Sequence, residues 1–306
     1  MSPRAATSPS TASQSPSPRG GGESSRNLIV TADDFGADVA VNEAVEIAHR
    51  DGVLTAASLM VAAPGAADAV ARAMRIPSLR VGLHLVLVEG RPALPPETIP
   101  HLVDTDGRFR ANMAAAGAMM FFHPAARREL AAEIAAQFEA FAATGLTLDH
   151  VNTHKHFHLH PTIAGLILEI GALHGLKAAR IPIEPRGVLT AVEPTGRFPP
   201  DPVFDLWARL ARRRFRRAGI AIPAQVFGLA WSGAMTAARV AGLIERLPAG
   251  LTEIYLHPAM GGGFEGAAPG YRYADELAAL TAPEVVLAAG RAGLRRGGFS
   301  DFAPSQ

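Results

Sequence analysis

Short apolar runs alternate with stretches of helical periodicity along almost the whole chain, and this alternation constrains the fold more than any other feature. The apolar runs predict strands at residues 27–33, 55–61, 80–85, 148–152, 178–182, 226–229, 251–256 and 299–302. Helices are predicted between them at residues 39–50, 66–75, 124–143, 161–174, 204–218, 236–246 and 283–295. Because strands that alternate with helices are joined by crossovers, we expect a parallel sheet. About seven such units favour an α/β fold, a distorted (β/α) barrel in a single domain, although periodicity alone does not exclude a doubly wound sheet.

The size and composition of the chain suit one such domain. At 306 residues, with 48% hydrophobic and 19% charged side chains, it can bury a sizeable core. Residues 1–26 are dominated by Ser, Pro, Thr, Gly and Arg, and such a segment cannot bury enough apolar surface to offset its ordering entropy. We therefore expect a disordered N-terminal tail at residues 1–26 and the barrel domain at residues 27–306.

Composition also argues against several classes of partner and location. The formal net charge of +1 creates no overall field that would attract nucleic acid. The tail lacks the apolar segment of a secretory signal, and no apolar run reaches the roughly 18 residues typical of a membrane-spanning helix. The absence of cysteine rules out disulfides and thiolate metal sites and fits a reducing compartment. We expect a cytoplasmic protein.

A histidine-rich segment at residues 148–161 is the densest concentration of metal-ligand chemistry in the chain. Five of the eleven histidines lie within it, at His150, His154, His156, His158 and His160. In an extended segment the last four would spread over roughly 20 Å, too far for one ion to bind them all. His154 lies nearest the strand end and is the predicted ligand, whereas His156 and His158 are expected to line the pocket or to orient ligands. A His-rich surface tract with incidental metal affinity is the alternative interpretation.

Other residues with metal-ligand or acid–base chemistry lie at the ends of predicted strands. They are Asp33 and Asp34 at the end of residues 27–33, His84 within residues 80–85, and His257 after residues 251–256. Each has an ordinary interpretation by itself, because an Asp can cap the next helix and a core His can bond to backbone. On a parallel barrel, however, the carboxyl ends of all strands face one rim, where active sites form. The convergence of carboxylates and imidazoles at these strand ends predicts a metal site, and such ligands suit zinc, iron, manganese or magnesium.

Further segments have irregular or amphipathic sequences. Residues 88–120 and 183–202 have the Pro and Gly content of loops that carry binding function on a barrel. The predicted helix at residues 204–218 combines six arginines with an apolar face, so it can lie on an anionic membrane, or be a barrel helix with a solvated basic face. The apolar face comprises Phe204, Trp207, Ala208, Ala211 and Phe215. The apolar run at residues 113–122 is either a lid that contacts lipid or a buried helix.

Four motifs resemble those of the YdjC-like carbohydrate deacetylase family, which includes the chitooligosaccharide deacetylases. They are Thr-Ala-Asp-Asp-Phe-Gly at residues 31–36, Gly-Leu-His-Leu at 82–85, the run from His150 to Pro161, and Leu-His-Pro at 256–258. The resemblance extends from about Asn27 to about Phe302. Within that family, residues 54–61, 82–90 and 226–235 are most similar to the hopanoid-biosynthesis deacetylase.

The resemblance implies a distorted (β/α) barrel, one divalent metal ion (Mg²⁺ or Zn²⁺) and removal of the acetyl group from an N-acetylated amino sugar. Matched residue by residue, three side chains correspond to the family's metal ligands, namely Asp34, His84 and His154. In the same comparison Asp33 corresponds to the general base and His257 to the general acid.

Other positions either are expected to bind substrate or depart from the family pattern. Substrate binding is expected of His156, His158 and Arg180. Asn152 stands where the family often has Asp, and Lys155 stands where it often has His. Neither departure removes an assigned ligand, but both put a role for those two positions in doubt.

The leading hypothesis is a metal-dependent N-deacetylase that acts on an N-acetylglucosamine-type sugar carried by a hopanoid glycolipid. A soluble chitooligosaccharide deacetylase is the alternative enzyme, and a non-catalytic metal- or sugar-binding barrel would not need Asp33 and His257. The expected partners are the amino-sugar substrate, a membrane surface contacted peripherally, and a second copy of the chain in a homodimer. Nucleic acid is not an expected partner.

Overall fold

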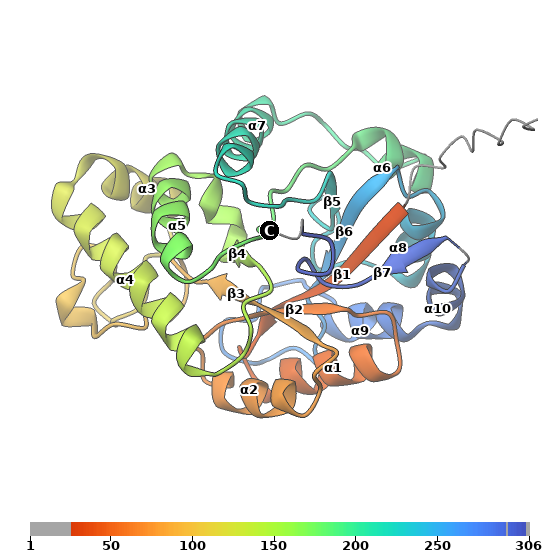
Figure 1. Ribbon diagram of the computed structural model, residues 1–306, viewed down its shortest axis with the longest axis horizontal. Coiled ribbons are helices and arrows are strands. Elements are labelled where there is room, and N and C mark those ends of the chain that lie inside the picture. The colour runs from red at the N-terminus through yellow and green to blue at the C-terminus, as the bar shows by residue number, and fades with distance from the viewer. Residues whose placement is uncertain (1–25, 292, 304–306) are drawn as a thin grey trace, which may run out of the picture.

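Seven parallel strands form the centre of the molecule, and helices surround them (Figure 1). The computed structural model describes residues 26–291 and 293–303. Within this part of the chain the strands are β1 (Arg26–Phe35), β2 (Ala56–Leu59), β3 (Arg80–Leu85), β4 (Val151–Thr153), β5 (Gln225–Phe227), β6 (Gly250–Leu256) and β7 (Leu294–Arg296). They pair in the order β4-β3-β2-β1-β6-β5, and β7 pairs with the first residues of β1.

The segment at residues 178–183 spans the space between the two edge strands, β4 and β5. Ala179 forms a parallel bridge with Val151 of β4. On the other side, the backbone N–H of Val226 in β5 donates to the carbonyl of Ile183 at 2.9 Å. The prediction of a strand at residues 178–182 therefore corresponds to an extended segment held by isolated bridges. The curled parallel sheet confirms the prediction of an α/β fold of the distorted (β/α) barrel type.

The helices pack around this sheet, with α1, α2 and α9 along one side and α3, α4 and α5 gathered on another (Figure 1). Their bounds are α1 (Val39–Arg50), α2 (Ala66–Met74), α3 (Met113–Phe122), α4 (Pro124–Ala143), α5 (Pro161–Leu173), α6 (Arg186–Val192), α7 (Pro202–Arg217), α8 (Ala237–Glu245), α9 (Tyr273–Thr281) and α10 (Pro283–Ala289). Short 3₁₀ turns are η1 (Pro96–Thr98) and η2 (His154–Leu159).

Local sequence signals explain why several elements begin and end where they do. Asp38 caps α1 because its carboxylate accepts from the backbone N–H of Ala40 at 2.8 Å. Helices α4, α5, α7 and α10 each begin with a proline, whose fixed φ suits the first helical turn and whose missing N–H is not needed there. Strands β1 and β3 are buried along almost their whole length, as expected for a parallel sheet covered on both faces.

The end of the chain differs from the prediction. Residues 299–302 were predicted as a strand but form a turn, and the last strand is β7. The predicted helix at residues 283–295 ends at Ala289, because Gly290 caps it and Gly293 takes a positive φ of 87° that favours glycine. Phe299 is nonetheless buried, since its ring stacks on His150. Phe299 is therefore apolar because its ring fills buried space beside His150 at the base of the sheet, and not because it belongs to a strand.

Two helices were not predicted: α6 lies within the stretch of residues 183–202 that was predicted to be irregular, and α9 follows β6. Helix α3 coincides with the apolar run at residues 113–122, for which a helix was one of the two interpretations. Among the described residues, no helix is both long and apolar enough to cross a membrane. The predicted disordered tail lies outside the described residues apart from Arg26, which begins β1.

Candidate metal centre and active site

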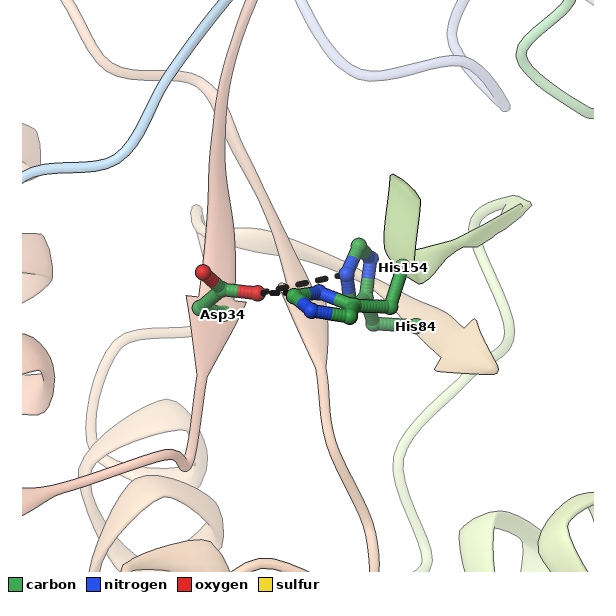
Figure 2. A group of neighbouring side chains, drawn as sticks. All are labelled: Asp34, His84 and His154. Atoms are coloured by element: carbon green, nitrogen blue, oxygen red, sulfur yellow. Dashed lines mark ion pairs between the residues drawn. The ribbon is translucent and has the colours of Figure 1, made fainter. Parts of the chain in front are cut away.

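Three strand ends bring Asp34, His84 and His154 together (Figure 2). Asp34 is near the end of β1, His84 is in β3, and His154 directly follows β4. The Oδ1 atom of Asp34 lies 3.3 Å from Nε2 of His84 and 3.3 Å from Nδ1 of His154. Ligand atoms about 2.1 Å from a tetrahedral ion lie roughly 3.4 Å apart, so these separations match two edges of such a coordination shell. The group therefore has the composition and the spacing of a divalent metal site.

The orphaned atoms of this group provide a test of that fit. Asp34 Oδ1 and His84 Nε2 are both buried, and neither has a hydrogen-bond partner among the described residues. The other ring nitrogen of His84, Nδ1, faces the Asn152 side-chain oxygen at 2.7 Å and must donate to it. In the neutral ring the Nε2 lone pair of His84 is then aimed at a carboxylate oxygen. Burial lowers the pKa of His84, but Asp33 and Asp34 outweigh that effect and raise it, so the site favours a positive charge at this position. Two facing lone pairs repel, and a cation between them would remove the penalty.

An unusual backbone at the end of β1 turns two adjacent carboxylates toward the same space. Neighbouring side chains in a regular strand point to opposite faces of the sheet. Asp34 has a positive φ of 62°, and the register between β1 and β2 shifts between Ala32 and Phe35. As a result Asp33 and Asp34 both approach His84, with Asp33 Oδ1 at 4.0 Å from its Nδ1. A bulge of this kind re-aims a side chain, and such strain is common at functional sites.

Asp33 is held by two buried donors. Arg180 contacts one carboxylate oxygen through its Nη1, and the side-chain amide of Asn152 donates to the other at 3.0 Å. Burial raises the pKa of Asp33, but the charge of Arg180 outweighs that effect and holds the pKa well below its usual range. Asp33 is therefore an ionised carboxylate at neutral pH, fixed beside the three candidate ligands.

A cavity of about 600 Å³ opens over this group. Its lining includes Asp33, Asp34, His84, His154, His156, Tyr255, His257, Tyr271, Tyr273 and Phe204. All four non-glycine residues with positive φ in the described part of the chain also line it, namely Asp34, Glu89, Lys155 and His156. Its size and its mixture of aromatic walls with a few polar groups are typical of a small-molecule site.

His257 enters this cavity from the end of β6. Its backbone N–H donates to the Glu276 carboxylate at 2.5 Å. Its ring packs edge-on against Tyr255 and Tyr271, with centroid separations of 5.7 Å and 5.1 Å. Two aromatic rings and a hydrogen-bonded backbone thus hold the imidazole of His257. Because β6 and β4 lie on opposite sides of β1 in the strand order, His257 and His154 approach the cavity from opposite directions.

The three predicted substrate-binding residues differ in position. His156 lines the cavity, where its Nε2 meets the Tyr255 hydroxyl at 2.9 Å, and burial lowers its pKa well below the usual value. His158 is buried against Thr153, and burial lowers its pKa to about 3. Arg180 is fully buried between Asp33 and Glu253, so it lies behind Asp33 and does not line the cavity. The predicted substrate contact of Arg180 is thus replaced by a contact with Asp33.

The histidine-rich segment is also arranged differently from the extended geometry considered above. Residues 154–159 form the turn η2, with Lys155 and His156 in the left-handed region at φ of 54° and 55°. The turn directs His156 and His158 inward to separate partners and leaves His154 with Asp34.

Sequence reasoning missed several buried polar residues around the site. Asn152, whose role was in doubt, contacts both Asp33 and His84. Glu253 is fully buried in β6 and accepts from Thr31 at 2.8 Å and from Arg180. A carboxylate inside the apolar run of residues 251–256 was the available signal, because an unpaired buried charge is costly and implies a buried cationic partner.

Comparisons with known proteins show the family of this chain. The family model described as YdjC-like protein matches residues 27–288. A carbohydrate deacetylase from Brevibacillus brevis is 41% identical over 143 residues, which are 47% of this chain and 54% of that protein. One from Geobacillus stearothermophilus is 37% identical over 161 residues, which are 52% of this chain and 60% of that protein. The chain thus spans little more than half the length of the curated relatives it matches.

A solved structure shares the fold over nearly the whole chain. It is a protein of Enterococcus faecalis named for cellobiose-phosphate cleavage, with a TM-score of 0.72 and 24% sequence identity. The match covers 92% of this chain and 100% of that one. At this level of identity the likeness extends to the fold alone.

Proposed function

Because the chain belongs to the YdjC-like family, we propose that it hydrolyses the N-acetyl group of an N-acetylglucosamine-type sugar, with a divalent ion held by Asp34, His84 and His154. The observation that carries the proposal is the position of this group in one cavity with an ionised carboxylate, Asp33, and a second histidine, His257. The relatives named as carbohydrate deacetylases support the choice of substrate class.

The protein residues divide the reaction between them. A divalent ion bound here would supply Lewis-acid chemistry, polarising the acetyl carbonyl and lowering the pKa of water. Asp33 accepts a proton from the attacking water, whose oxygen bonds to the acetyl carbon. His257 donates a proton to the sugar nitrogen as the carbon–nitrogen bond breaks, so that acetate and a free amine leave. Arg180 keeps Asp33 ionised and oriented for its role.

We further propose that the sugar is carried by a lipid, for which hopanoid is the leading hypothesis. Helix α7 supports this through its exposed face. The predicted apolar face is largely ordinary barrel packing, because Ala208, Ala211 and Phe215 are buried. A second apolar stripe on the same helix is 38% to 64% exposed and comprises Val203, Leu206, Trp207 and Leu210. On the outer face of α7 this stripe continues into exposed arginines, at Arg213, Arg214 and Arg217.

The position of α7 relative to the cavity links this surface to the substrate. Phe204, in the first turn of α7, lines the cavity and so joins the exposed stripe to the site. On α3, which is a helix with one buried side, Phe121 and Phe122 are exposed as well. An apolar stripe beside arginines suits an anionic membrane, which would deliver a lipid-linked sugar to the cavity mouth. A homodimer and the identity of the metal stay predictions.

Acetate release tests the activity and the substrate class together. A hopanoid that bears N-acetylglucosamine and diacetylchitobiose are compared, each with and without chelator. Faster turnover of the lipid-linked sugar supports the leading hypothesis, and preference for diacetylchitobiose favours the soluble alternative. Activity that survives complete metal removal would contradict the metal-dependent reaction.

Two variants separate the roles of the site residues. Asp33→Asn should retain metal binding and lower kcat by about 10²–10⁴-fold, because it removes the proton acceptor and leaves the ligands in place. His84→Ala should weaken metal binding by more than about 100-fold and abolish turnover. Asp51→Asn, an exposed residue at the end of α1, is the matched control and should behave as the parent protein. Unchanged metal affinity in His84→Ala would refute the ligand assignment.

Membrane binding is tested with liposomes. Binding to anionic vesicles should fall in Leu206→Ser and Trp207→Ser and should persist partly at high salt, because salt screens only the arginine contribution. Leu287→Ser, on α10, removes an equally apolar and more exposed side chain away from α7 and should have no effect. Equal binding by all four proteins, or no binding at any salt concentration, would refute the membrane surface.

A further inference from the structure

A continuous chain of buried hydrogen bonds runs through the barrel to the candidate metal site. We call it the buried relay, and it comprises Asp149, His150, Ser58 and Asn152. Asp149 Oδ2 lies 2.9 Å from His150 Nδ1, and His150 Nε2 lies 3.0 Å from the Ser58 hydroxyl. That hydroxyl accepts from the Asn152 side-chain amide at 2.9 Å. The relay therefore connects Asp149, two residues before β4, with Asp33 near the end of β1 and His84 in β3.

At the end of the relay that is far from the metal site, Asp149 can act only as a hydrogen-bond acceptor. Asp149 accepts from the backbone N–H groups of Phe299 and Ser300, at 3.0 Å and 2.9 Å, and from the Ser300 hydroxyl at 2.6 Å. Burial raises the pKa of Asp149, but hydrogen bonds from His150 and Ser300 outweigh it and lower the pKa. An ionised carboxylate can only accept, so Nδ1 of His150 must carry the hydrogen.

Each further role follows from the one before. With its hydrogen on Nδ1, His150 accepts at Nε2, so the Ser58 hydroxyl must donate to it. Ser58 then accepts from Asn152, which requires the nitrogen of that amide to face Ser58. Asp33, whose other carboxylate oxygen contacts Arg180, demands the same orientation, because it accepts from the same nitrogen at 3.0 Å. The two ends of the relay thus agree on one orientation of the amide.

That orientation determines the tautomer of His84. The amide oxygen of Asn152 faces His84 Nδ1 at 2.7 Å and can only accept, so Nδ1 carries the hydrogen. In the neutral ring the other nitrogen, Nε2, is then left with a free lone pair directed at Asp34. This is the form of imidazole that binds a metal ion. If the amide rotated by half a turn, its N–H₂ would face Nδ1 and would favour the tautomer that cannot bind.

The packing around the relay holds His150 in place. A Cβ atom at Gly82 in β3 would lie 2.4 Å from His150 Nδ1, so only glycine leaves room for the ring. On its other side the ring stacks on Phe299, with centroids 4.1 Å apart. Ser58, His150 and Asp149 have the composition of a nucleophilic triad, but Ser58 and His150 have no exposed surface that a substrate could reach. Their chemistry is available only to their neighbours inside the barrel.

We propose that the buried relay is a positioning device that holds His84 in its metal-binding tautomer and fixes the orientation of Asp33. It also gives Asn152 a role that a carboxylate there could fill only in part, since Asn152 both donates to Asp33 and accepts from His84. The consequence for metal binding rests on the proposed function, whereas the tautomers themselves do not. The tautomers can be measured in metal-free protein without substrate.

The first test is long-range ¹⁵N–¹H NMR of the metal-free parent protein in alkaline buffer, where the imidazole rings are neutral and Nδ1–H is distinguished from Nε2–H. His84 and His150 should both carry the hydrogen on Nδ1. An Nε2–H form of either ring, or an equal mixture at His84, would overturn the proposal. This measurement involves no substitution, so it decides the question even if the variants below fail to fold.

The second test removes single links and measures Zn²⁺ affinity by competition with a chelator. Ser58→Ala should weaken Zn²⁺ binding by about 10-fold or more and shift the His84 tautomer, as loss of a partner behind a metal ligand does elsewhere. Thr252→Val is the matched control, because it also removes a buried barrel hydroxyl, one that accepts from Gln225 and does not contact the relay. Equal Zn²⁺ affinity in the folded Ser58→Ala and Thr252→Val variants would overturn the proposal.

A third comparison uses two substitutions of Asn152. Asn152→Asp keeps an acceptor for His84 Nδ1 and should bind Zn²⁺ within about 3-fold of the parent, whereas Asn152→Leu should lose about 10–100-fold. Equal loss in both would contradict the tautomer argument. The relay and the proposed function fail separately: correct tautomers without deacetylation would refute the activity alone, and deacetylation with the wrong tautomers would refute the relay alone.

Discussion

Replacement of Arg180 by methionine should destabilise the protein strongly, because Arg180 is the buried counter-ion of two carboxylates. Its guanidinium is fully buried, contacts Asp33 and Glu253, and lies over the ring of Tyr255 at 4.2 Å. Both acidic partners are buried as well. Methionine fills a similar volume but leaves two negative charges in the barrel without a cation. Breaking a buried ion pair in this way costs about 3–5 kcal/mol of unfolding free energy.

The loss should depend on pH, with a sign that follows from the pKa of Asp33. In the parent protein that pKa is held below the unfolded value of about 3.9, so the pairing stabilises the fold above that pH and is lost only as pH falls through the folded pKa. Without Arg180, burial dominates and raises the pKa of Asp33 above the unfolded value. The variant then loses stability as pH rises through its new folded pKa. The difference between the two proteins should therefore be larger at pH 8 than at pH 5.

Urea denaturation of the metal-free proteins at pH 5, 6, 7 and 8 measures this difference. Arg186→Met is the matched control, because it breaks an ion pair with Asp205 in which the side chains are 38% and 31% exposed. That pair should contribute only about 0.2–1 kcal/mol at any of these pH values. A loss below about 1 kcal/mol in Arg180→Met, or a loss that is the same at pH 5 and pH 8, would refute the assignment of Arg180 as the essential buried counter-ion.

Three further substitutions test the structure around the site. Gly82→Ala should lower the unfolding free energy by about 1–3 kcal/mol in urea denaturation, because the new Cβ would overlap His150; an unchanged midpoint would contradict the close packing. Phe299→Ala should cost about 3–5 kcal/mol in the same assay if the ring plugs the base of the sheet, and a loss typical of an exposed turn would argue against it. Glu265→Gln should break the exposed ion pairs with Arg91 and Arg108. Amide exchange in the glycine-rich loop at residues 260–271 should then become faster, with no change in melting temperature. Unaltered exchange would show that these pairs do not hold the loop.

Much of the fold could be predicted because its signals are local. The bounds of α1, α4 and β3 agree with the prediction, since a capping Asp38, an initial Pro124 and a continuous apolar run each act within a few residues. Strand β7 could not be predicted in this way. Its residues Leu294–Arg296 have no apolar strand pattern, and they are a strand only because the first residues of β1 offer them a free edge.

The sequence by itself determined which chemistry is available and on which edge of the fold it lies. Strand–helix alternation implies parallel strands, and parallel strands place their carboxyl ends on one rim. That rule grouped Asp33, Asp34, His84, His154 and His257, and the family resemblance then singled out Asp34, His84 and His154 as the metal ligands. Only the tertiary structure decided how these side chains are held. Asp33 meets Arg180 and Asn152 across separations of 147 and 119 residues, and no local pattern reports such partners. Burial removes water from these groups, so their charge and tautomer depend on neighbours that only the folded chain brings into contact.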